Sequence, residues 1–223
     1  YPGMFVSNPK GATALYGEFA PVPDKVVEGG HNKLQGIVEN RKPYIAECKA
    51  VTRTPWRILL VAEDVNAWLD NDMVYRLARP CPAEEDYSWV KPGKVAWEWW
   101  NDWDVRGVDF VAGINTETYK YYIDFASRHG LEYVILDEGW AVKYADDLYA
   151  VVPEIDLEEI VRHGNEKNVG IILWAGYSAF MKDVEGVCSH YAKMGVKGFK
   201  VDFLDRNDQK MEDFIYKASE VAA

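Results

Sequence analysis

The hydrophobic pattern of the chain changes near residue 90. From Lys91 onward, short continuous apolar runs alternate with segments whose apolar residues recur every three or four positions. The first kind of run predicts buried strands and the second predicts amphipathic helices. The predicted strands span residues 95–100, 133–136, 170–174 and 198–203. Strands and helices that alternate in this way indicate parallel βαβ units.

Capping residues mark where these predicted helices begin and end. The first helix follows Asn115 and stops at Gly130, and the second begins with the capping-box pattern Asp156-x-x-Glu159. A third helix ends at Gly195, and a fourth occupies the end of the chain. Each helix therefore follows one strand.

The predicted fold is α/β, as the first half of a (β/α)8 barrel. Four βα units take about 130 residues here, so eight would take about 260, the usual size of such a barrel. We assign residues 91–223 to the first four units of a truncated barrel and expect the protein to continue beyond Ala223. A doubly wound open sheet is the competing fold. It is disfavoured because no G-x-G-x-x-G motif or phosphate-binding loop follows any predicted strand.

Residues 1–80 have a different pattern, with short apolar runs broken by Gly and Pro. Residues 42–51 and 56–62 are predicted strands, and a short helix capped by Asp64 follows them. We interpret residues 1–80 as the end of a β-domain and residues 81–90, with their prolines and acidic residues, as a linker.

Composition narrows the possible partners. The net charge of −11 and pI near 4.9 argue against nucleic acid and anionic membranes, because an acidic surface repels phosphate. No apolar run approaches the ~20 residues of a membrane span. The three cysteines lie far apart and predict neither a disulfide framework nor a zinc site. Aromatic residues make up 14% of the chain, which suits a sugar ligand because ring faces cover the C–H faces of a pyranose.

Aromatic and polar residues gather where the predicted strands end, which is where barrel enzymes place their active sites. The four strand ends read WEWWNDW (97–103), DEGW (137–140), WAGY (174–177) and KVDFLD (200–205), and they hold six of the nine Trp. We predict that Trp100, Trp140 and Trp174 contact the substrate. The alternative is that these rings only close the barrel mouth.

Charged residues at two of these strand ends are the candidates for chemistry. Lys200 and Asp202 are two apart on a strand and so share a face. The ammonium keeps the carboxylate ionised, which suits a nucleophile, although a structural ion pair is the alternative. Asp137 and Glu138 are suited to accept hydrogen bonds from sugar hydroxyls, with loop or helix capping as the alternative. We predict Asp202 as catalytic and Lys200, Asp137 and Glu138 as substrate-binding.

The remaining polar candidates carry weaker signals. Asp205 and Asp208 are interpreted as loop or cap residues. The four histidines form no metal or triad spacing and are interpreted as surface residues; they are His31, His129, His163 and His190.

The strand-end motifs as a group resemble those of glycoside hydrolase family 97. The matching motifs are WWNDW (99–103), LDEGW (136–140) and GFKVDFLDR (198–206). They resemble more loosely the DDGW and KxD strand ends of related α-galactosidase barrels. Residues 89–94 and 115–119 are similar to that family's entry into the barrel.

The resemblance implies a domain order and a substrate class. It implies an N-terminal β-sandwich, to which residues 1–80 would belong, then a (β/α)8 barrel and a C-terminal β-domain. It also implies calcium-dependent hydrolysis of α-linked glucosides or galactosides by a bacterial periplasmic or secreted enzyme. The partner would be an oligosaccharide or α-glycoside, with no nucleic acid and no membrane insertion.

The family resemblance also assigns roles to residues. A retaining branch, α-galactosidase-like, carries an Asp nucleophile at the end of the fourth barrel strand, the position matched by Asp202. The inverting α-glucosidase branch lacks that residue, so its presence favours retention and a galactoside. Lys200, Asp137 and Glu138 would hold sugar hydroxyls. The acid/base Glu and the calcium-ligating carboxylates would lie outside this chain, and no metal ligand is expected within it.

Three alternatives remain at this point. One is an inverting α-glucosidase of the same family. Another is a barrel lyase or aldolase with Lys200 as a Schiff-base amine, which the Trp-rich strand ends disfavour. The third is a sugar-binding protein without catalytic activity.

Overall fold

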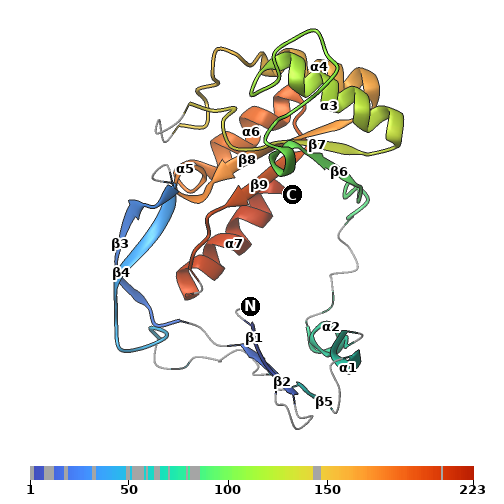
Figure 1. Cartoon of the computed structure of the whole chain (residues 1–223). Coiled ribbons are helices and arrows are strands. Elements are labelled where there is room, and N and C mark those ends of the chain that lie inside the picture. Colours follow the sequence, from blue (N-terminus) through green and yellow to red (C-terminus); the bar gives the residue numbers. More distant parts are fainter. Residues whose placement is uncertain are drawn as a thin grey trace.

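A computed structural model describes most of the chain (Figure 1). The described residues are 3–7, 13–17, 20–31, 34–48, 51, 58, 60–62, 66–69, 71–78, 80, 86–142, 147–206 and 208–223. They form a four-stranded parallel sheet with helices, a three-stranded antiparallel sheet and a two-stranded hairpin.

The parallel sheet contains the four strands that follow residue 90. They are β6 (Val95–Trp97), β7 (Tyr133–Leu136), β8 (Gly170–Gly176) and β9 (Gly198–Asp202). The strands lie in sequence order, and every neighbouring pair is parallel. A doubly wound sheet reverses its strand order at a switch point. The described strands have no such reversal, so the competing fold is disfavoured.

Helices follow the strands, as the pattern predicts. They are α3 (Thr116–His129), α4 (Leu157–Lys167), α5 (Tyr177–Phe180), α6 (Val184–Met194) and α7 (Gln209–Ala222). Figure 1 shows α3, α4 and α6 together on one side of the parallel sheet. Among the described residues, no helix is long and apolar enough to cross a bilayer.

The predicted caps form, with one difference. The side chain of Asn115 caps α3, and Gly130 ends that helix in the left-handed conformation at φ 64°. The side chain of Asp156 accepts a hydrogen bond from the main-chain amide of Glu159 at 3.0 Å. The difference concerns the side chain of Glu159, the other member of the predicted capping box. Its carboxylate forms an ion pair with Arg162 at 2.6 Å on the helix surface.

The two faces of the parallel sheet differ in burial. Side chains alternate along a strand, so every second residue faces the helices. The helix-facing residues of β7 and β8 are at most 2% exposed; they are Val134, Leu136, Ile171, Leu173 and Ala175. Their neighbours Tyr133, Ile135, Gly170 and Ile172 are only half-buried. The core therefore lies between the sheet and its helices.

The first parallel strand is shorter than predicted. The expected strand 95–100 ends at Trp97, and a 3-10 helix, η2 (Glu98–Asn101), follows. The chain turns because Asp102 and Trp103 adopt left-handed φ angles of 54° and 55° and their amides bond back to η2 carbonyls. Trp100 therefore lies on this turn rather than on the strand.

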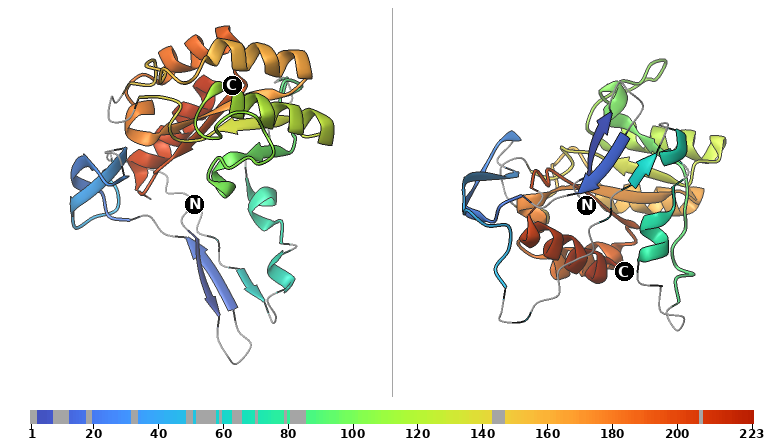
Figure 2. Two further views of the ribbon diagram at one scale, coloured as in Figure 1. Left: turned by 45° about the horizontal axis from the view of Figure 1, so that its top comes forward. Right: turned by 90° about the horizontal axis from the view of Figure 1, so that it is seen from below.

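The N-terminal region holds the antiparallel elements. The three-stranded sheet lies apart from the parallel sheet, at the bottom of Figure 1 and of the left view of Figure 2, whereas the hairpin lies beside α5. The three-stranded sheet has the order β1 (Gly3–Ser7), β2 (Thr13–Gly17) and β5 (Leu60–Ala62). The hairpin pairs β3 (Pro23–Gly29) with β4 (Gln35–Arg41). Two short helices, α1 (Asn66–Leu69) and α2 (Met73–Leu77), follow.

Part of the N-terminal prediction is wrong. Residues 42–48 of the predicted strand 42–51 contain bends and no strand, because β4 already ends at Arg41 and the chain then turns away. The prediction 56–62 is met only by Leu60–Ala62, and residues 56, 57 and 59 lie outside the described residues. Asp64 and residues 81–85 also lie outside them. The β-sandwich and linker assignments stay predictions.

Candidate active site

Lys200 joins the ends of two strands that are separated in the sheet. Its Nζ atom lies 2.9 Å from Oδ2 of Asp202 on β9 and 3.0 Å from Oδ2 of Asp137 after β7. Trp97 donates from Nε1 to the same Asp137 oxygen at 2.6 Å, and its ring centroid lies 4.6 Å from the ammonium. All four side chains lie on the sheet face that points away from the helices. The structure therefore brings three predicted site residues into one network.

Asp202 is held by three donors. Burial raises the pKa of its carboxyl, but hydrogen bonds from Lys200, the Phe203 amide and Trp174 outweigh burial, so the pKa lies below its ordinary value. The Phe203 amide donates to Oδ1 at 2.8 Å. Phe203 itself adopts φ 62°, a left-handed angle unusual for an aromatic residue. The side chain of Asp202 is 40% exposed, so a substrate can reach this ionised carboxylate.

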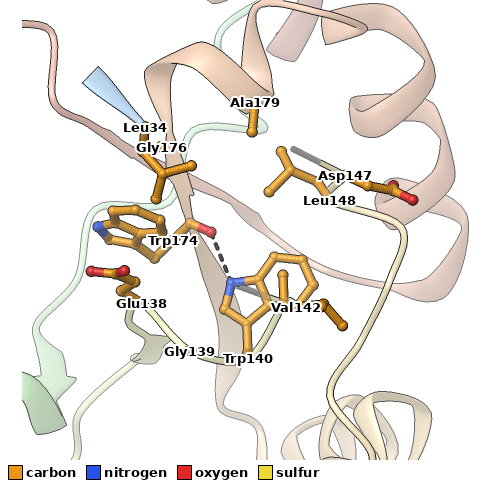
Figure 3. A pocket seen from close by; sticks show the side chains of 11 residues that line it. Leu34, Glu138, Gly139, Trp140, Val142, Asp147, Leu148, Trp174, Gly176 and Ala179 are labelled. Carbon is orange, nitrogen blue, oxygen red and sulfur yellow. Dashed lines mark hydrogen bonds between the residues drawn. The ribbon is translucent and has the colours of Figure 1, made fainter. Parts of the chain in front are cut away.

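Two of the predicted tryptophans, Trp140 and Trp174, are joined by a hydrogen bond (Figure 3). Trp174 donates from Nε1 to Asp202 at 3.2 Å. Trp140 donates from Nε1 to the main-chain carbonyl of Trp174 at 2.8 Å and is fully buried. Both rings border a cavity of about 30 Å³, room for about one water. The predicted substrate contact of Trp140 stays a prediction, and in this structure its ring has no exposed surface.

The third predicted tryptophan belongs to an exposed cluster. Trp100 is 73% exposed and packs edge-on against Trp97 with ring centroids 5.2 Å apart. Trp99 stacks on Trp97 at 5.5 Å. The cluster extends an aromatic surface from the Lys200 network into solvent.

Glu138 contacts His31, which was predicted from the sequence to be a surface residue. The Nε2 atom of His31, at the tip of the β3–β4 hairpin, lies 2.8 Å from Oε2 of Glu138. The His31 ring also packs against Phe203, with centroids 5.5 Å apart. The N-terminal region thus reaches the candidate site. No local pattern reports this contact, because 107 residues separate the two side chains.

Glycine permits the close approach of this hairpin. A Cβ atom at Gly176, at the end of β8, would lie 2.8 Å from Cβ of Leu34 in the hairpin. The main-chain amide of Ser178 donates to the carbonyl of Leu34 at 3.1 Å. The hairpin therefore docks on the carboxyl end of β8 through main-chain contact, which a larger residue at position 176 would obstruct.

Glu98 is a second residue that the sequence reading missed. It directly follows β6, is fully buried, and its Oε1 atom accepts a hydrogen bond from the Asp137 amide at 2.7 Å. Burial raises the pKa of its carboxyl to about 7, and the hydrogen bonds from Asp137 and Tyr119 offset only part of that effect. The sequence did contain a signal for Glu98. It lies two positions after Ala96, so alternation along a strand would place it on the same buried, helix-facing side, where a carboxylate is unexpected.

The remaining polar candidates have structural surroundings. Asp208 caps α7 and forms a buried ion pair with Arg206 at 2.9 Å, as its interpretation as a cap residue predicts. Asp205 is exposed. The surface prediction for His163 is wrong, because this residue lies within α4 and pairs with Asp124 at 2.9 Å, with 14% of its side chain exposed.

The described side chains can be compared with what a calcium ion needs. Calcium requires six to eight oxygen ligands. Across the described part of the chain, no three His, Cys, Asp or Glu side chains are grouped so that they could hold a metal ion.

Comparison with known proteins gives one matching family model and similar curated proteins. The model described as Glycoside hydrolase 97 matches residues 98–223, more than half of the chain. A "Retaining alpha-galactosidase" of Bacteroides thetaiotaomicron is 55% identical over 223 residues, 100% of this chain and 34% of that protein. A "Probable retaining alpha-galactosidase" of Streptomyces bingchenggensis is 31% identical over 164 residues, 70% of this chain and 24% of that protein. The chain thus spans about a third of the length of the first relative and about a quarter of the second.

Solved structures show the same fold. A glycoside hydrolase family 97 enzyme variant from a Pseudoalteromonas strain aligns with a TM-score of 0.72 at 20% identity, covering 98% of this chain and 38% of that one. A β-arabinopyranosidase aligns with a TM-score of 0.57 at 16% identity, covering 99% of this chain and 48% of that one. In both, the chain corresponds to part of a larger enzyme.

Proposed function

Because the chain belongs to glycoside hydrolase family 97, we propose that the complete protein is a retaining α-galactosidase with Asp202 as its nucleophile. The observation that carries the proposal is the ionised, partly exposed carboxylate of Asp202, held by Lys200 at the carboxyl end of β9. The relatives named retaining α-galactosidases, one of them 55% identical over the whole chain, support the substrate and the stereochemistry.

Retention requires a carboxylate that is ionised and able to reach the anomeric carbon. The three donors around Asp202 favour ionisation and fix its orientation. In the first step, one Asp202 oxygen forms a covalent bond to the anomeric carbon while the leaving oxygen takes a proton from an acid/base Glu. In the second step, water attacks that carbon, gives its proton to the same Glu and releases Asp202. The acid/base Glu comes from outside this chain, about 5–5.5 Å from Asp202.

The other predicted residues hold the sugar. Asp137 and Glu138 follow β7, beside Lys200, where their oxygens accept hydrogen bonds from hydroxyls. Trp100 offers its exposed face to the sugar ring. Trp174 donates a hydrogen bond to Asp202, and Trp140 donates to the main-chain carbonyl of Trp174.

The Lys200 network disfavours a Schiff-base lyase. Two carboxylates contact the Lys200 ammonium at 2.9 and 3.0 Å, so the amine is not free to attack a carbonyl carbon. Borohydride with a carbonyl substrate would trap a lyase intermediate, and no trapped adduct is expected here.

The rest of the protein completes the fold in this proposal. Residues 91–223 form the first four units of a (β/α)8 barrel, residues 81–90 a linker, and residues 1–80 the end of a β-sandwich domain. The half-buried face of β6 to β9 supports the barrel, because a second half would cover it. Calcium dependence and a periplasmic or secreted location rest on the family alone. Loss of activity on exhaustive chelation, restored by calcium, tests the first.

Proton NMR of the first sugar released from an aryl α-galactoside tests the mechanism. The α-anomer is expected first, and an initial β-anomer would show inversion. Asp202→Gly removes the nucleophile and leaves space for azide. Azide should then restore turnover and yield a β-galactosyl azide, whereas rescue at Asp137→Gly instead would move the nucleophile to β7.

A further inference from the structure

Glu98 lies behind the candidate site, on the helix-facing side of the sheet. It follows β6 directly, and its side chain lies among Asp137 after β7, Tyr119 on α3 and Trp103 beyond η2. It is fully buried. A charged residue is rarely fully buried unless it is paired, so its surroundings require an explanation.

Three donors meet at one oxygen of Glu98. Its Oε1 atom accepts from the Asp137 amide at 2.7 Å, from the Tyr119 hydroxyl at 2.9 Å and from Trp103 Nε1 at 3.1 Å. Its Oε2 atom is buried and has no hydrogen-bond partner among the described residues. Three donors exclude a proton from Oε1, so a proton bound to this carboxyl sits on Oε2.

A continuous line of contacts leads from Glu98 to Asp202. Glu98 holds the main-chain amide of Asp137, the Asp137 carboxylate contacts Lys200 at 3.0 Å, and Lys200 contacts Asp202 at 2.9 Å. Glu98 thus anchors the main chain of Asp137 at the point where β7 ends.

We propose that Glu98 is a positioning residue that orients Asp137 toward Lys200, and through Lys200 sets the place of Asp202. Glu98 touches no substrate in this assignment. The effect on catalysis rests on the proposed function, whereas the effect on the Asp137 geometry does not.

The charge on Glu98 adds a pH-dependent component. Burial, together with a smaller contribution from repulsion by the Asp137 carboxylate, raises its pKa to about 7, so the carboxyl is partly protonated near neutral pH. The titratable groups that face it are Asp137 after β7 and Tyr119 and Tyr122 on α3. Lys200 on β9 lies beyond Asp137. Ionisation of Glu98 therefore changes the field at Asp137.

Two substitutions in the complete protein separate positioning from mere filling of the core. Glu98→Gln keeps an oxygen for the three donors but cannot ionise. Glu98→Leu removes the acceptor at similar volume. Glu132→Gln is the matched control, because Glu132 also accepts a main-chain amide, that of Lys94 at 2.6 Å, at the opposite end of β7.

Kinetics on an aryl α-galactoside give the first readout. Glu98→Leu should lower kcat/KM by about 10- to 100-fold, and Glu98→Gln by less than about threefold at pH 5. The ratio of Glu98→Gln to wild-type kcat/KM should change through an inflection near pH 7. For Glu132→Gln this ratio should stay constant. A constant ratio for Glu98→Gln, or a folded Glu98→Leu with wild-type kcat/KM, would overturn the proposal.

A crystal structure of each variant gives a readout that needs no activity. In Glu98→Leu the Asp137 carboxylate should leave Lys200, and in Glu98→Gln the 3.0 Å contact should persist. If Glu98→Leu does not fold, Glu98→Gln still tests the proposal. For this variant both the Asp137–Lys200 contact and the pH dependence of kcat/KM relative to wild type are predicted. An unmoved Asp137 in Glu98→Leu would overturn the proposal. A wild-type protein inactive on α-galactosides would instead overturn the proposed function and leave this structural test valid.

Discussion

The two faces of the parallel sheet use the same strands for different purposes. On the helix-facing side, Leu136 and Leu173 are fully buried and belong to the hydrophobic core. On the other side, at the ends of the same strands, Asp137, Lys200 and Asp202 form a polar network, with 26% and 40% of the last two side chains exposed. Strand alternation separates the two sets, since consecutive residues point to opposite faces.

We infer from this difference that residues on one face of the sheet mainly determine stability and that residues on the other face mainly determine catalysis. Substitution on the helix-facing side should change the free energy of unfolding, and substitution on the other side should change turnover. Glu98 is the exception, because it is a carboxyl on the helix-facing side that bonds to Asp137. The following predictions test the separation, from the largest expected effect to the smallest.

Asp202→Asn should abolish catalysis with little change in stability. An amide cannot act as the nucleophile, so kcat should fall by about 10⁴-fold or more, as when catalytic residues are removed from other hydrolases. Steady-state kinetics on an aryl α-galactoside and the unfolding midpoint measure the two quantities. Asp205→Asn, an exposed neighbour, is the control and should keep wild-type turnover. Near-normal turnover of Asp202→Asn would remove Asp202 from the chemistry.

Leu173→Ala should have the reverse effect. Leu173 is fully buried, so truncation should lower the free energy of unfolding by about 2–5 kcal/mol. Turnover per folded molecule should remain within about threefold of wild type. Chemical denaturation of the complete protein measures the loss, with Val111→Ala, at an 86% exposed residue, as the control. A stable but inactive Leu173→Ala would contradict the separation of the faces.

Glu98→Gln should alter how stability depends on pH. The folded-state pKa of Glu98, about 7, lies above its ordinary value of 4.5, so the wild type loses stability as pH rises from about 4.5 through 7. The variant lacks that loss, so its stability relative to wild type should rise across this window by up to about 3 kcal/mol. Denaturation at pH 5 and pH 8 measures the change. Equal differences at both pH values would show that Glu98 does not titrate there.

Asp137→Asn should weaken substrate binding without removing the chemistry. Loss of a charge-assisted hydrogen bond costs about 1.5–3 kcal/mol, so kcat/KM should fall by roughly 10- to 100-fold. Added azide should not restore the activity. Restoration by azide would be the observation that identifies Asp137, and not Asp202, as the nucleophile.

His31→Ala should have the smallest effect. The His31 side chain is 56% exposed, and an exposed contact to a carboxylate contributes about 0.2–1 kcal/mol. A rise in KM of less than about fivefold is expected, since Glu138 loses a partner. His129→Ala at the end of α3 should leave KM unchanged. An effect of His31→Ala as large as that of Asp137→Asn would place the hairpin within the substrate site itself.

Local patterns predicted the parallel half of the molecule well. The strand Tyr133–Leu136 and the helix from Thr116 to His129 have the bounds that the apolar runs, Asn115 and Gly130 predict. The position of Lys200 beside Asp202 also followed from alternation along one strand. These features depend on residues within a few positions of one another.

Contacts between distant segments do not follow from local sequence patterns. The end of the first strand at Trp97 depends on the turn through Asp102, and the burial of Glu98 depends on Tyr119 and Trp103 closing over it. The sequence placed Trp140 at a strand end but did not reveal that its ring lies within the core.

The amino-acid sequence by itself determined the order of strands and helices, their caps, and the face on which Lys200 and Asp202 lie. These follow from backbone geometry and from hydrogen bonds between near neighbours. Only the tertiary structure decided that Asp137 would meet Lys200 across 63 residues and that His31 would reach Glu138 across 107. Such contacts depend on how the sheet and the hairpin pack against each other. The spacing of hydrophobic and polar residues within one segment carries no information about that packing.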